Sequence, residues 1–219
     1  MPTWYGEASW LEATPQPINI AFTETAFTFH VDLPYYDSPP GILCLHCVER
    51  SQCVEGGETL LVDSLACAEI LREKHPEHFR ALCEIPATFR QHANGHFTIR
   101  CTHIKLDADG FTPLAVIWSP PFKGVLRASV EDAKRYYSAY RAFADIINDL
   151  ETAAEFRYRF VLRPGDTVVL NNRQWLHART AFSLNGGRRR LRVAYVSAEH
   201  FASRFNSLII KRTGRDDLL

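Results

Sequence analysis

The stretch AFTFHVDLPYYDSPPG, residues 26–41, decides how the fold is interpreted. It alternates like a β-strand and then stops at two prolines, which cannot continue a hydrogen-bonded ladder. In a strand, residues two apart share a face, so His30 and Asp32 point the same way and Val31 points the other way. An imidazole and a carboxylate that converge from one edge provide two of the three ligands of a facial metal site. The stretch therefore predicts a metal centre with one ligand from elsewhere in the chain.

Composition narrows the class of protein. The 219 residues are 46% apolar and 23% charged, which predicts one globular domain spanning 1–219. The formal net charge is zero, so charge gives no reason to expect binding to nucleic acid or to an anionic membrane. No apolar run is long enough for a transmembrane helix, and the first residues lack a secretory signal pattern. We expect a cytoplasmic protein that acts on a small molecule, with a mitochondrial location left open.

Two of the six cysteines, Cys44 and Cys47, have the CxxC spacing of some zinc and redox sites. The segment ILCLHCV reads as a strand, in which residues three apart lie on opposite faces, and no second pair follows. We interpret them as reduced cysteines of the core.

The periodicity predicts a mainly β fold with two helical insertions. A helical segment at 63–85 has Asp63 or Ser64 as N-cap and a break at His75–Pro76, and a second begins at Ser129. A hairpin with a Pro-Gly-Asp turn is expected over 157–179. The other extended segments are 18–22, 25–33, 41–50, 55–63, 85–118 and 189–197. Many strands with helices between them favour a β-barrel or jelly roll with the helices packed outside.

The third metal ligand is expected to be a histidine near a strand end, and His177 fits best. It follows the apolar strand of VVLNNRQWLHAR, where a barrel would return it to His30 and Asp32. The other histidines are weaker candidates. His75 and His78 lie on a charged helical surface, and His92, His96 and His103 lie in a polar stretch. His46 and His200 have no candidate partner ligand nearby in the sequence.

The HxD pair at His30, the distant His177 and an arginine just beyond it resemble the Fe(II)/2-oxoglutarate dioxygenases of the taurine dioxygenase superfamily. Within it, the γ-butyrobetaine dioxygenase and trimethyllysine dioxygenase family is most similar. The matching segments cover most of the chain: residues 19–47, 56–63, 171–179 and 189–197. The resemblance implies a double-stranded β-helix (jelly-roll) core, Fe(II) at His30, Asp32 and His177, and 2-oxoglutarate and dioxygen as cosubstrates, with ascorbate as an aid.

2-Oxoglutarate has a far carboxylate that needs a buried cation, and a guanidinium suits this role because it forms bidentate, permanently charged pairs. Strand alternation places Arg189 on one face with Leu191 and Val193. The family pattern also falls on Arg189. Thr59 and Asn19 match further cosubstrate contacts of the family.

A trimethylammonium group is best recognised by aromatic faces. The resemblance implies an aromatic cage, and the matching positions are Phe22, Tyr195, and Tyr5 or Trp10, although core aromatics would look the same in sequence. The leading hypothesis is therefore hydroxylation of a small betaine-like substrate such as γ-butyrobetaine, as in carnitine biosynthesis.

Two departures from the family keep alternatives open. The stretch VIWSPPFKG, with Ser119, stands where the family has an asparagine-rich loop that holds the substrate carboxylate. The chain also begins close to the first cage position, so we expect a domain truncated at its N-terminus, without the zinc module of relatives. The alternatives are a taurine- or alkyl-acid-type dioxygenase, a trimethyllysine-type dioxygenase, and a truncated non-catalytic relative. A homodimer is possible in each case.

Overall fold

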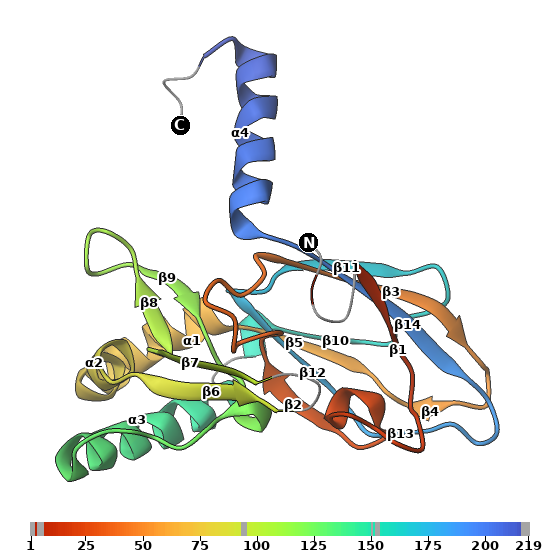
Figure 1. Ribbon diagram of the computed structural model, residues 1–219, viewed down its shortest axis with the longest axis horizontal. Coiled ribbons are helices and arrows are strands. Elements are labelled where there is room, and N and C mark those ends of the chain that lie inside the picture. The colour runs from red at the N-terminus through yellow and green to blue at the C-terminus, as the bar shows by residue number, and fades with distance from the viewer. Residues whose placement is uncertain (1–2, 4–6, 93–95, 150, 152–153, 216–219) are drawn as a thin grey trace.

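The computed structural model describes residues 3, 7–92, 96–149, 151 and 154–215 of the chain. Two antiparallel four-stranded sheets form its body (Figure 1). The first sheet has the strand order β1 (Ala8–Leu11), β14 (Arg189–Val196), β3 (Ile42–Arg50) and β11 (Thr167–Asn171). The second has the order β10 (Arg157–Phe160), β5 (Thr59–Asp63), β12 (Trp175–Arg179) and β2 (Phe27–His30).

Smaller elements surround the two sheets. The two-stranded pairs are β4 (Glu55–Gly56) with β13 (Phe182–Ser183), β6 (Ala87–Gln91) with β7 (Phe97–Cys101), and β8 (Ile104–Leu106) with β9 (Pro113–Val116). The helices α1 (Ser64–Lys74), α2 (Pro76–Glu84) and α3 (Val130–Asn148) gather at one side of the body (Figure 1). Single 3-10 turns are η1 (Ile20–Phe22), η2 (Pro120–Phe122) and η3 (Ala154–Phe156). The expectation of a mainly β fold with helices between strands is confirmed.

Capping residues set the helix boundaries as the sequence predicts. The Asp63 carboxylate accepts hydrogen bonds from the backbone N–H groups of Leu65 and Ala66 at the start of α1. Pro76 ends α1 and begins α2, because proline suits a first helical turn and not a helix interior. Ser129 caps α3 by accepting from the N–H of Asp132 at 3.0 Å.

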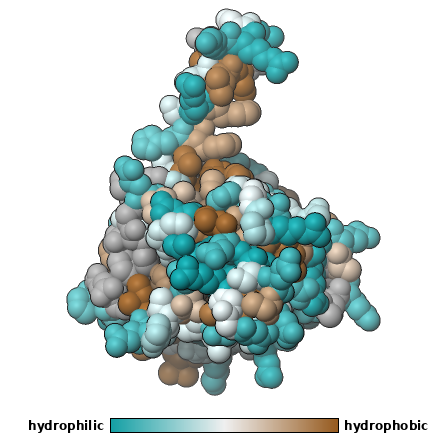
Figure 2. Space-filling view, turned by 90° about the vertical axis from the view of Figure 1, so that its right-hand side faces the viewer, coloured by the Kyte–Doolittle hydropathy of each residue, from teal (hydrophilic) through white to brown (hydrophobic). Residues whose placement is uncertain are grey.

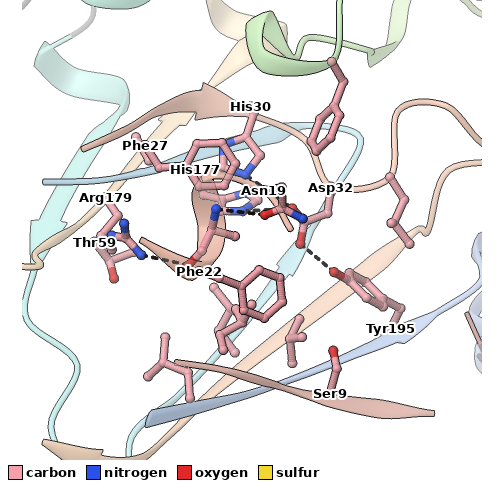
Figure 3. Close-up of a pocket in the computed structure, with 18 of the residues that line it drawn as sticks. Ser9, Asn19, Phe22, Phe27, His30, Asp32, Thr59, His177, Arg179 and Tyr195 are labelled. Carbon is pink, nitrogen blue, oxygen red and sulfur yellow. Dashed lines mark hydrogen bonds and ion pairs between the residues drawn. The ribbon is translucent and has the colours of Figure 1, made fainter. Parts of the chain in front are cut away.

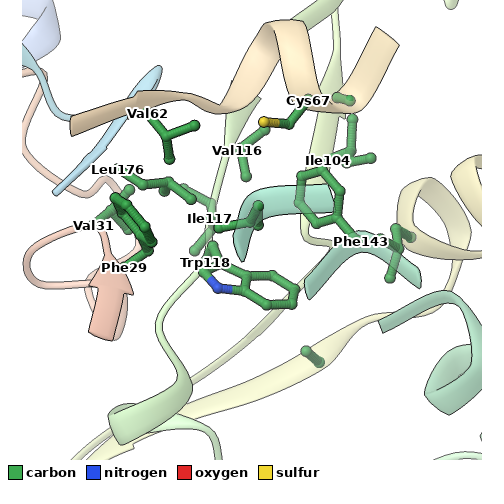
Figure 4. Close-up of a cluster of buried hydrophobic side chains, with 14 of the residues drawn as sticks. Phe29, Val31, Val62, Cys67, Ile104, Val116, Ile117, Trp118, Phe143 and Leu176 are labelled. Carbon is green, nitrogen blue, oxygen red and sulfur yellow. The ribbon is translucent and has the colours of Figure 1, made fainter. Parts of the chain in front are cut away.

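The core lies between the helices and the second sheet (Figure 4). Phe29, Val62 and Leu176, from three neighbouring strands of that sheet, are buried against side chains of the helical side such as Cys67 and Phe143. Because side chains alternate along a strand, this packing turns other positions of the same strands, such as Thr59 and His177, toward the first sheet. The core thereby fixes which side chains face the space between the sheets.

His103 is a buried member of this core, and its assignment to a polar stretch is wrong. Its side chain is 1% exposed and packs against Trp118 and Tyr136. Its Nδ1–H donates to the carbonyl of Ile117 at 2.7 Å, and its Nε2 accepts from the hydroxyl of Tyr136 at 2.8 Å. The neutral imidazole satisfies both contacts, and burial lowers the pKa of His103 to about 4.

We expect the free energy of unfolding to fall as the pH drops from about 6.5 to about 4, because the unfolded chain binds a proton at His103 that the folded chain rejects. Each unit of pKa difference between the folded and unfolded chain corresponds to about 1.4 kcal/mol, so protonation of His103 is expected to lower the free energy of unfolding by on the order of 3 kcal/mol below pH 4. Urea unfolding at pH 7 and pH 4.5 measures it. A His103→Leu variant shows a smaller drop; an equal drop in both proteins would contradict this assignment.

Two expected β segments differ from the structure. Residues 18–22 were expected as a strand but contain the turn η1. The Asn19 side chain caps this turn by accepting a hydrogen bond from the N–H of Ala21. The hairpin over 157–179 is also wrong, because β10 pairs with β5 in one sheet and β11 pairs with β3 in the other. The Pro-Gly-Asp turn crosses between sheets, and strand alternation alone does not indicate the pairing partner.

The C-terminal helix α4 (Ala198–Thr213) was not expected from the sequence. It projects from the body and carries apolar side chains along its length, among them the exposed Phe201, Phe205 and Leu208 (Figures 1 and 2). Ser197 caps its start, and Gly214 ends it in the left-handed region at φ 67°. Among the described residues, no helix combines the length and the apolar character needed to cross a membrane.

Candidate metal centre

Three side chains that could hold a metal meet at one end of a pocket between the sheets (Figure 3). His30 ends β2, and His177 lies opposite it in register on β12. Asp32 follows two residues after the strand end, and its Oδ1 lies 3.3 Å from Nε2 of His30 and 3.5 Å from Nε2 of His177. The ligand atoms of all three lie within 4.8 Å of one another. The structure thus brings together the three residues that the sequence picked as ligands.

Hydrogen bonds orient two of the three side chains. The Nδ1–H of His30 donates to the carbonyl of Thr28 at 2.7 Å, which leaves the lone pair of Nε2 directed at the other two groups. The hydroxyl of Tyr195, from the opposite sheet, donates to Oδ2 of Asp32 at 2.7 Å (Figure 3). Oδ1 of Asp32 therefore remains directed toward both histidines.

The protonation states suit a divalent cation. Burial alone would raise the pKa of the Asp32 carboxyl, but the adjacent His177 and His30 together hold it well below its usual range. Burial, and then the neighbouring His177, lower the pKa of His30, so its imidazole is neutral at pH 7. Two imidazole nitrogens and one carboxylate form the facial donor set used for non-haem Fe(II), so the residues present fit that metal.

Asn172 positions the turn that carries Asp32, and sequence analysis missed it. Its side chain is fully buried, and its Oδ1 accepts from the backbone N–H of Asp32 at 2.9 Å. Its Nδ2 donates to the carbonyls of Asp32 and Pro40 at 3.0 and 3.1 Å. The available signal was the polar pair Asn171-Asn172 at the end of an apolar strand.

We expect Asn172→Ala to lower both stability and metal affinity. Three backbone groups lose a buried partner, at about 1–3 kcal/mol for each group left unsatisfied. A metal site that loses an outer support of this kind typically loses 10–100-fold in affinity. Urea unfolding and an Fe(II) or Mn(II) titration measure the two effects. The neighbouring Asn171→Ala, at an exposed position, is the control; wild-type metal affinity in Asn172→Ala would contradict a positioning role.

The pocket begins at His30, Asp32 and His177 and runs between the two sheets, with a volume of about 90 Å³. Both sheets and η1 contribute to its wall. Five of the predicted binding residues are among its lining: Asn19, Phe22, Thr59, Arg189 and Tyr195. Phe27 stacks on the His30 ring with centroids 3.8 Å apart, and Tyr35 adds a further aromatic wall. The pocket is thus apolar and aromatic, with its polar groups at defined points.

Two buried guanidiniums, Arg189 and Arg179, line the same pocket. Arg179, the last residue of β12, donates to the carbonyls of Ala21, Thr23 and Thr25, so it ties η1 and the segment after it to β12. Arg189 makes only a long 3.5 Å contact to the carbonyl of Gly57 and lies over the Phe182 ring. Among the described residues, no carboxylate is within ion-pair distance of either one. Burial lowers the pKa of both to about 10, so both are charged at pH 7.

Glycines make room for Arg189. Gly56 and Gly57 have φ of 71° and 70°, a region that glycine favours. A Cβ on Gly57 would lie 3.1 Å from Nε of Arg189, and one on Gly56 would lie 2.2 Å from the carbonyl oxygen of Ala181. The Gly-Gly pair before Thr59 therefore has a packing reason: it lets β4 approach β13 and leaves space for the guanidinium.

The prediction that Trp10 belongs to the aromatic cage is wrong. Trp10 is 40% exposed and lies on the outer face of β1, where the guanidiniums of Arg190 and Arg192 cover its ring. Ser9 and Leu11, its neighbours on the other face of the strand, line the pocket instead. Tyr5, the alternative cage residue, lies outside the described residues. Ser119 is buried, and its hydroxyl has no hydrogen-bond partner among the described residues.

Comparison with known proteins agrees with this geometry. The sequence profile of the taurine catabolism dioxygenase TauD, TfdA family matches residues 5–195. The chain belongs to this family. All three clustered side chains, and Arg189 and Thr59, lie within the region that matches the TauD, TfdA profile.

Named relatives are similar over most of the chain. The γ-butyrobetaine dioxygenase of Pseudomonas sp. (strain AK-1) is 34% identical, over 88% of this chain and 48% of that protein. The trimethyllysine dioxygenase of Meyerozyma guilliermondii is 31% identical, over 96% of this chain and 52% of that protein. Dioxygenase str8 of Strobilurus tenacellus is 32% identical, over 82% of this chain and 41% of that protein. The chain thus spans about half the length of these relatives.

Solved structures share the fold. Asparagine oxygenase, in complex with Fe(II), a hydroxyasparagine and succinate, superposes with a TM-score of 0.67 at 14% identity, over 88% of this chain and 57% of that one. The non-haem iron oxygenase OrfP, in complex with Fe and α-ketoglutaric acid, gives 0.64 at 16% identity, over 91% of this chain and 59% of that one. At this level of identity, the likeness supports the fold alone.

Proposed function

We propose that the chain is an Fe(II)- and 2-oxoglutarate-dependent dioxygenase that hydroxylates a small betaine-like substrate such as γ-butyrobetaine. Its two facing sheets would be the double-stranded β-helix of a single domain over residues 1–219. One observation carries the proposal: His30, Asp32 and His177 share a pocket with the buried, unneutralised guanidinium of Arg189. A facial donor set and a buried cation are the two features that iron and a dicarboxylic keto acid require.

In this proposal, each polar group of the pocket has a task. His30, Asp32 and His177 hold Fe(II), and Tyr195 keeps the Asp32 carboxylate oriented through its hydrogen bond. Arg189 pairs with the far carboxylate of 2-oxoglutarate, supported by the Thr59 hydroxyl and by Asn19. Bound Fe(II), with 2-oxoglutarate and dioxygen, supplies the chemistry that places a hydroxyl on a C–H bond as succinate and carbon dioxide form.

The apolar wall orients the substrate and excludes water. Phe22 and Tyr195 present aromatic faces on the pocket side, which supports binding of a quaternary ammonium group through cation–π attraction. Phe22 has no hydroxyl, so its contribution is the ring face alone. The names of the γ-butyrobetaine relatives support this substrate class.

Trimethyllysine is the second candidate substrate, because a relative with that name matches 96% of this chain. It carries the same trimethylammonium group, so the aromatic wall would serve both. A taurine-type substrate would bring a sulfonate in place of the carboxylate and an unmethylated ammonium in place of the trimethylammonium group. A cytoplasmic location and a homodimer stay predictions; three relatives are named as mitochondrial trimethyllysine dioxygenases.

The test is succinate release by the purified chain with Fe(II), ascorbate and 2-oxoglutarate, with each of γ-butyrobetaine, trimethyllysine and taurine added in turn. Stimulation by γ-butyrobetaine above the other two supports the proposal. Stimulation by taurine alone would overturn the substrate class and keep the chemistry. No succinate from a chain that unfolds cooperatively would favour a non-catalytic relative.

A further inference from the structure

The loop that follows Asp32 holds a strained residue. Residues 33–41 connect Asp32 to β3, and Leu33, directly after Asp32, has a φ of 54°. This left-handed region is unfavourable for leucine, because its Cβ crowds the following carbonyl oxygen. The Leu33 side chain is buried, so it packs in this conformation. A strained residue persists only where its surroundings hold it. The contacts that hold the loop therefore decide where Asp32 points.

Two neighbouring residues of the turn between β11 and β12 hold this loop at different points. Asn172 binds both backbone groups of Asp32. Arg173 holds the other end of the loop. Its Nε and Nη2 donate to the carbonyl of Pro39 at 3.2 and 2.8 Å, and its Nη2 also donates to Oγ of Ser38 at 2.9 Å. The planar guanidinium thus binds two consecutive residues of the loop with one rigid group.

Arg173 itself has a fixed base. Its backbone N–H donates to Oδ1 of Asn171 at 3.0 Å. Its carbonyl accepts from the N–H of Val116, the last residue of β9, at 2.8 Å. Its side chain is 27% exposed, so it lies against the body of the protein for most of its length. The guanidinium therefore reaches the loop from a position that two other strands define.

The first turn of α4 meets the same end of the loop. The Ser38 hydroxyl donates to Oε1 of Glu199 at 2.9 Å, and this oxygen lies 4.0 Å from Nη2 of Arg173. A Cβ on Gly41 would lie 2.6 Å from Cα of Ala198, so the helix backbone lies directly against the loop. The rest of α4 projects from the body (Figure 1). The base of the helix is thus anchored at this loop.

The segment that leads into α4 also reaches the metal centre. Tyr195, near the end of β14, donates to Oδ2 of Asp32, and Ser197 caps α4 two residues later. The chain from Tyr195 to Glu199 therefore contacts both ends of the loop, at Asp32 and at Ser38. The loop lies between this segment and the turn that carries Arg173.

We propose that Arg173 and the first turn of α4 are positioning elements, which hold Asp32 in its metal-binding orientation without touching the metal. The inference rests on the proposed function, in which Asp32 is a ligand, and adds a support outside the pocket. Arg173 and Glu199 are not among the residues that line the pocket. Loss of the contacts at Ser38 and Pro39 lets the strained backbone at Leu33 relax, which moves the Asp32 carboxylate.

The test measures the Mn(II) dissociation constant by calorimetry in four proteins. Arg173→Gln removes the charge and the two-point contact, whereas Arg173→Lys keeps a donor for the Pro39 carbonyl. Arg163→Gln, at an exposed position, is the control for loss of an arginine. We expect about tenfold weaker binding in Arg173→Gln, the lower end of the range for an outer support of a metal site. Arg173→Lys loses less, and the control binds as wild type does.

Hydrogen exchange of the metal-free proteins separates positioning from a general loss of stability. We expect amides of residues 31–38 to exchange faster in Arg173→Gln than in wild type, while residues 42–50 of β3 keep their protection. Faster exchange in both regions would show a purely structural role and overturn the proposal. Wild-type Mn(II) affinity in Arg173→Gln would overturn it as well.

Ser38→Ala tests the contact with α4, and it keeps the proposal testable if Arg173→Gln does not fold. Ser38 is exposed, so its replacement leaves the core intact. We expect Mn(II) binding to weaken by about threefold, the size expected when one hydrogen bond at the surface is lost. Unchanged affinity in Ser38→Ala would overturn the role of α4.

Binding of 2-oxoglutarate at saturating Mn(II) separates this inference from the proposed function. We expect Arg173→Gln to bind 2-oxoglutarate as wild type does, because Arg189 and Thr59 lie in the pocket and Arg173 does not. Wild type that binds Mn(II) and 2-oxoglutarate, with equal Mn(II) affinity in Arg173→Gln, overturns the positioning role alone. Wild type that binds neither overturns the proposed function, and with it the role of Asp32 on which this inference rests.

Discussion

An Asp32→Ala variant is expected to release no succinate above background and to bind Fe(II) at least about 100-fold more weakly than wild type. The carboxylate is the one anionic group that contacts both His30 and His177, at 3.3 and 3.5 Å, among the described residues. Without it, only the two imidazole rings face the cation, and the loss exceeds the 10–100-fold typical of an outer partner. An Fe(II) titration under anaerobic conditions and a succinate assay measure the two effects.

The matched control is Asp37→Ala. Asp37 is an exposed aspartate of the same loop, so its replacement removes the same charge without touching the pocket. Metal affinity and turnover are expected to remain at the wild-type level. Retained Fe(II) affinity in Asp32→Ala would contradict the assignment of Asp32 as a ligand.

The second large effect is expected for Arg189→Met, which keeps much of the side-chain volume and removes the charge. If Arg189 pairs with the far carboxylate of 2-oxoglutarate, its removal leaves that carboxylate buried without a partner, at a cost of about 2–5 kcal/mol. The dissociation constant for 2-oxoglutarate then rises by at least about 30-fold. Fe(II) affinity remains unchanged, because Arg189 makes no contact with His30, Asp32 or His177 in the structure.

Arg190→Met serves as the control for the same strand. Arg190 lies next to Arg189 on the opposite face, where it pairs with Glu12 and covers Trp10. Its replacement is expected to leave 2-oxoglutarate binding within about twofold, since exposed ion pairs contribute about 1 kcal/mol or less. Equal losses in both variants would show that charge on the strand, and not the position of Arg189, governs binding.

Strand alternation and the family resemblance together located much of the candidate site. Alternation placed His30 and Asp32 on one side and Arg189 on the face it shares with Leu191, and the structure puts all of them at the pocket. Asp32, however, lies past the end of β2, where alternation no longer applies. Its placement depends on Asn172, more than a hundred residues away in sequence.

The remaining differences have similar causes. Which face of β1 meets the pocket depends on its pairing with β14, in which Ser9 faces Val193 and Leu11 faces Leu191, and this pairing is not visible in a single sequence. The family resemblance offered Trp10 as one of two matches to a cage position, and the structure places Ser9 and Leu11 at the pocket instead. The hairpin over 157–179 was wrong for the same reason, because local pattern predicts strands and not their partners.

The central claim is that His30, Asp32 and His177 hold Fe(II) beside a 2-oxoglutarate site at Arg189. Anaerobic addition of Fe(II) and 2-oxoglutarate, followed by visible spectroscopy, tests it most directly, because the keto acid gives a charge-transfer band only when it chelates the iron. We predict the band in wild type, its absence in Asp32→Ala, and its recovery at raised 2-oxoglutarate in Arg189→Met. Wild type without the band, or Asp32→Ala with it, would contradict the account.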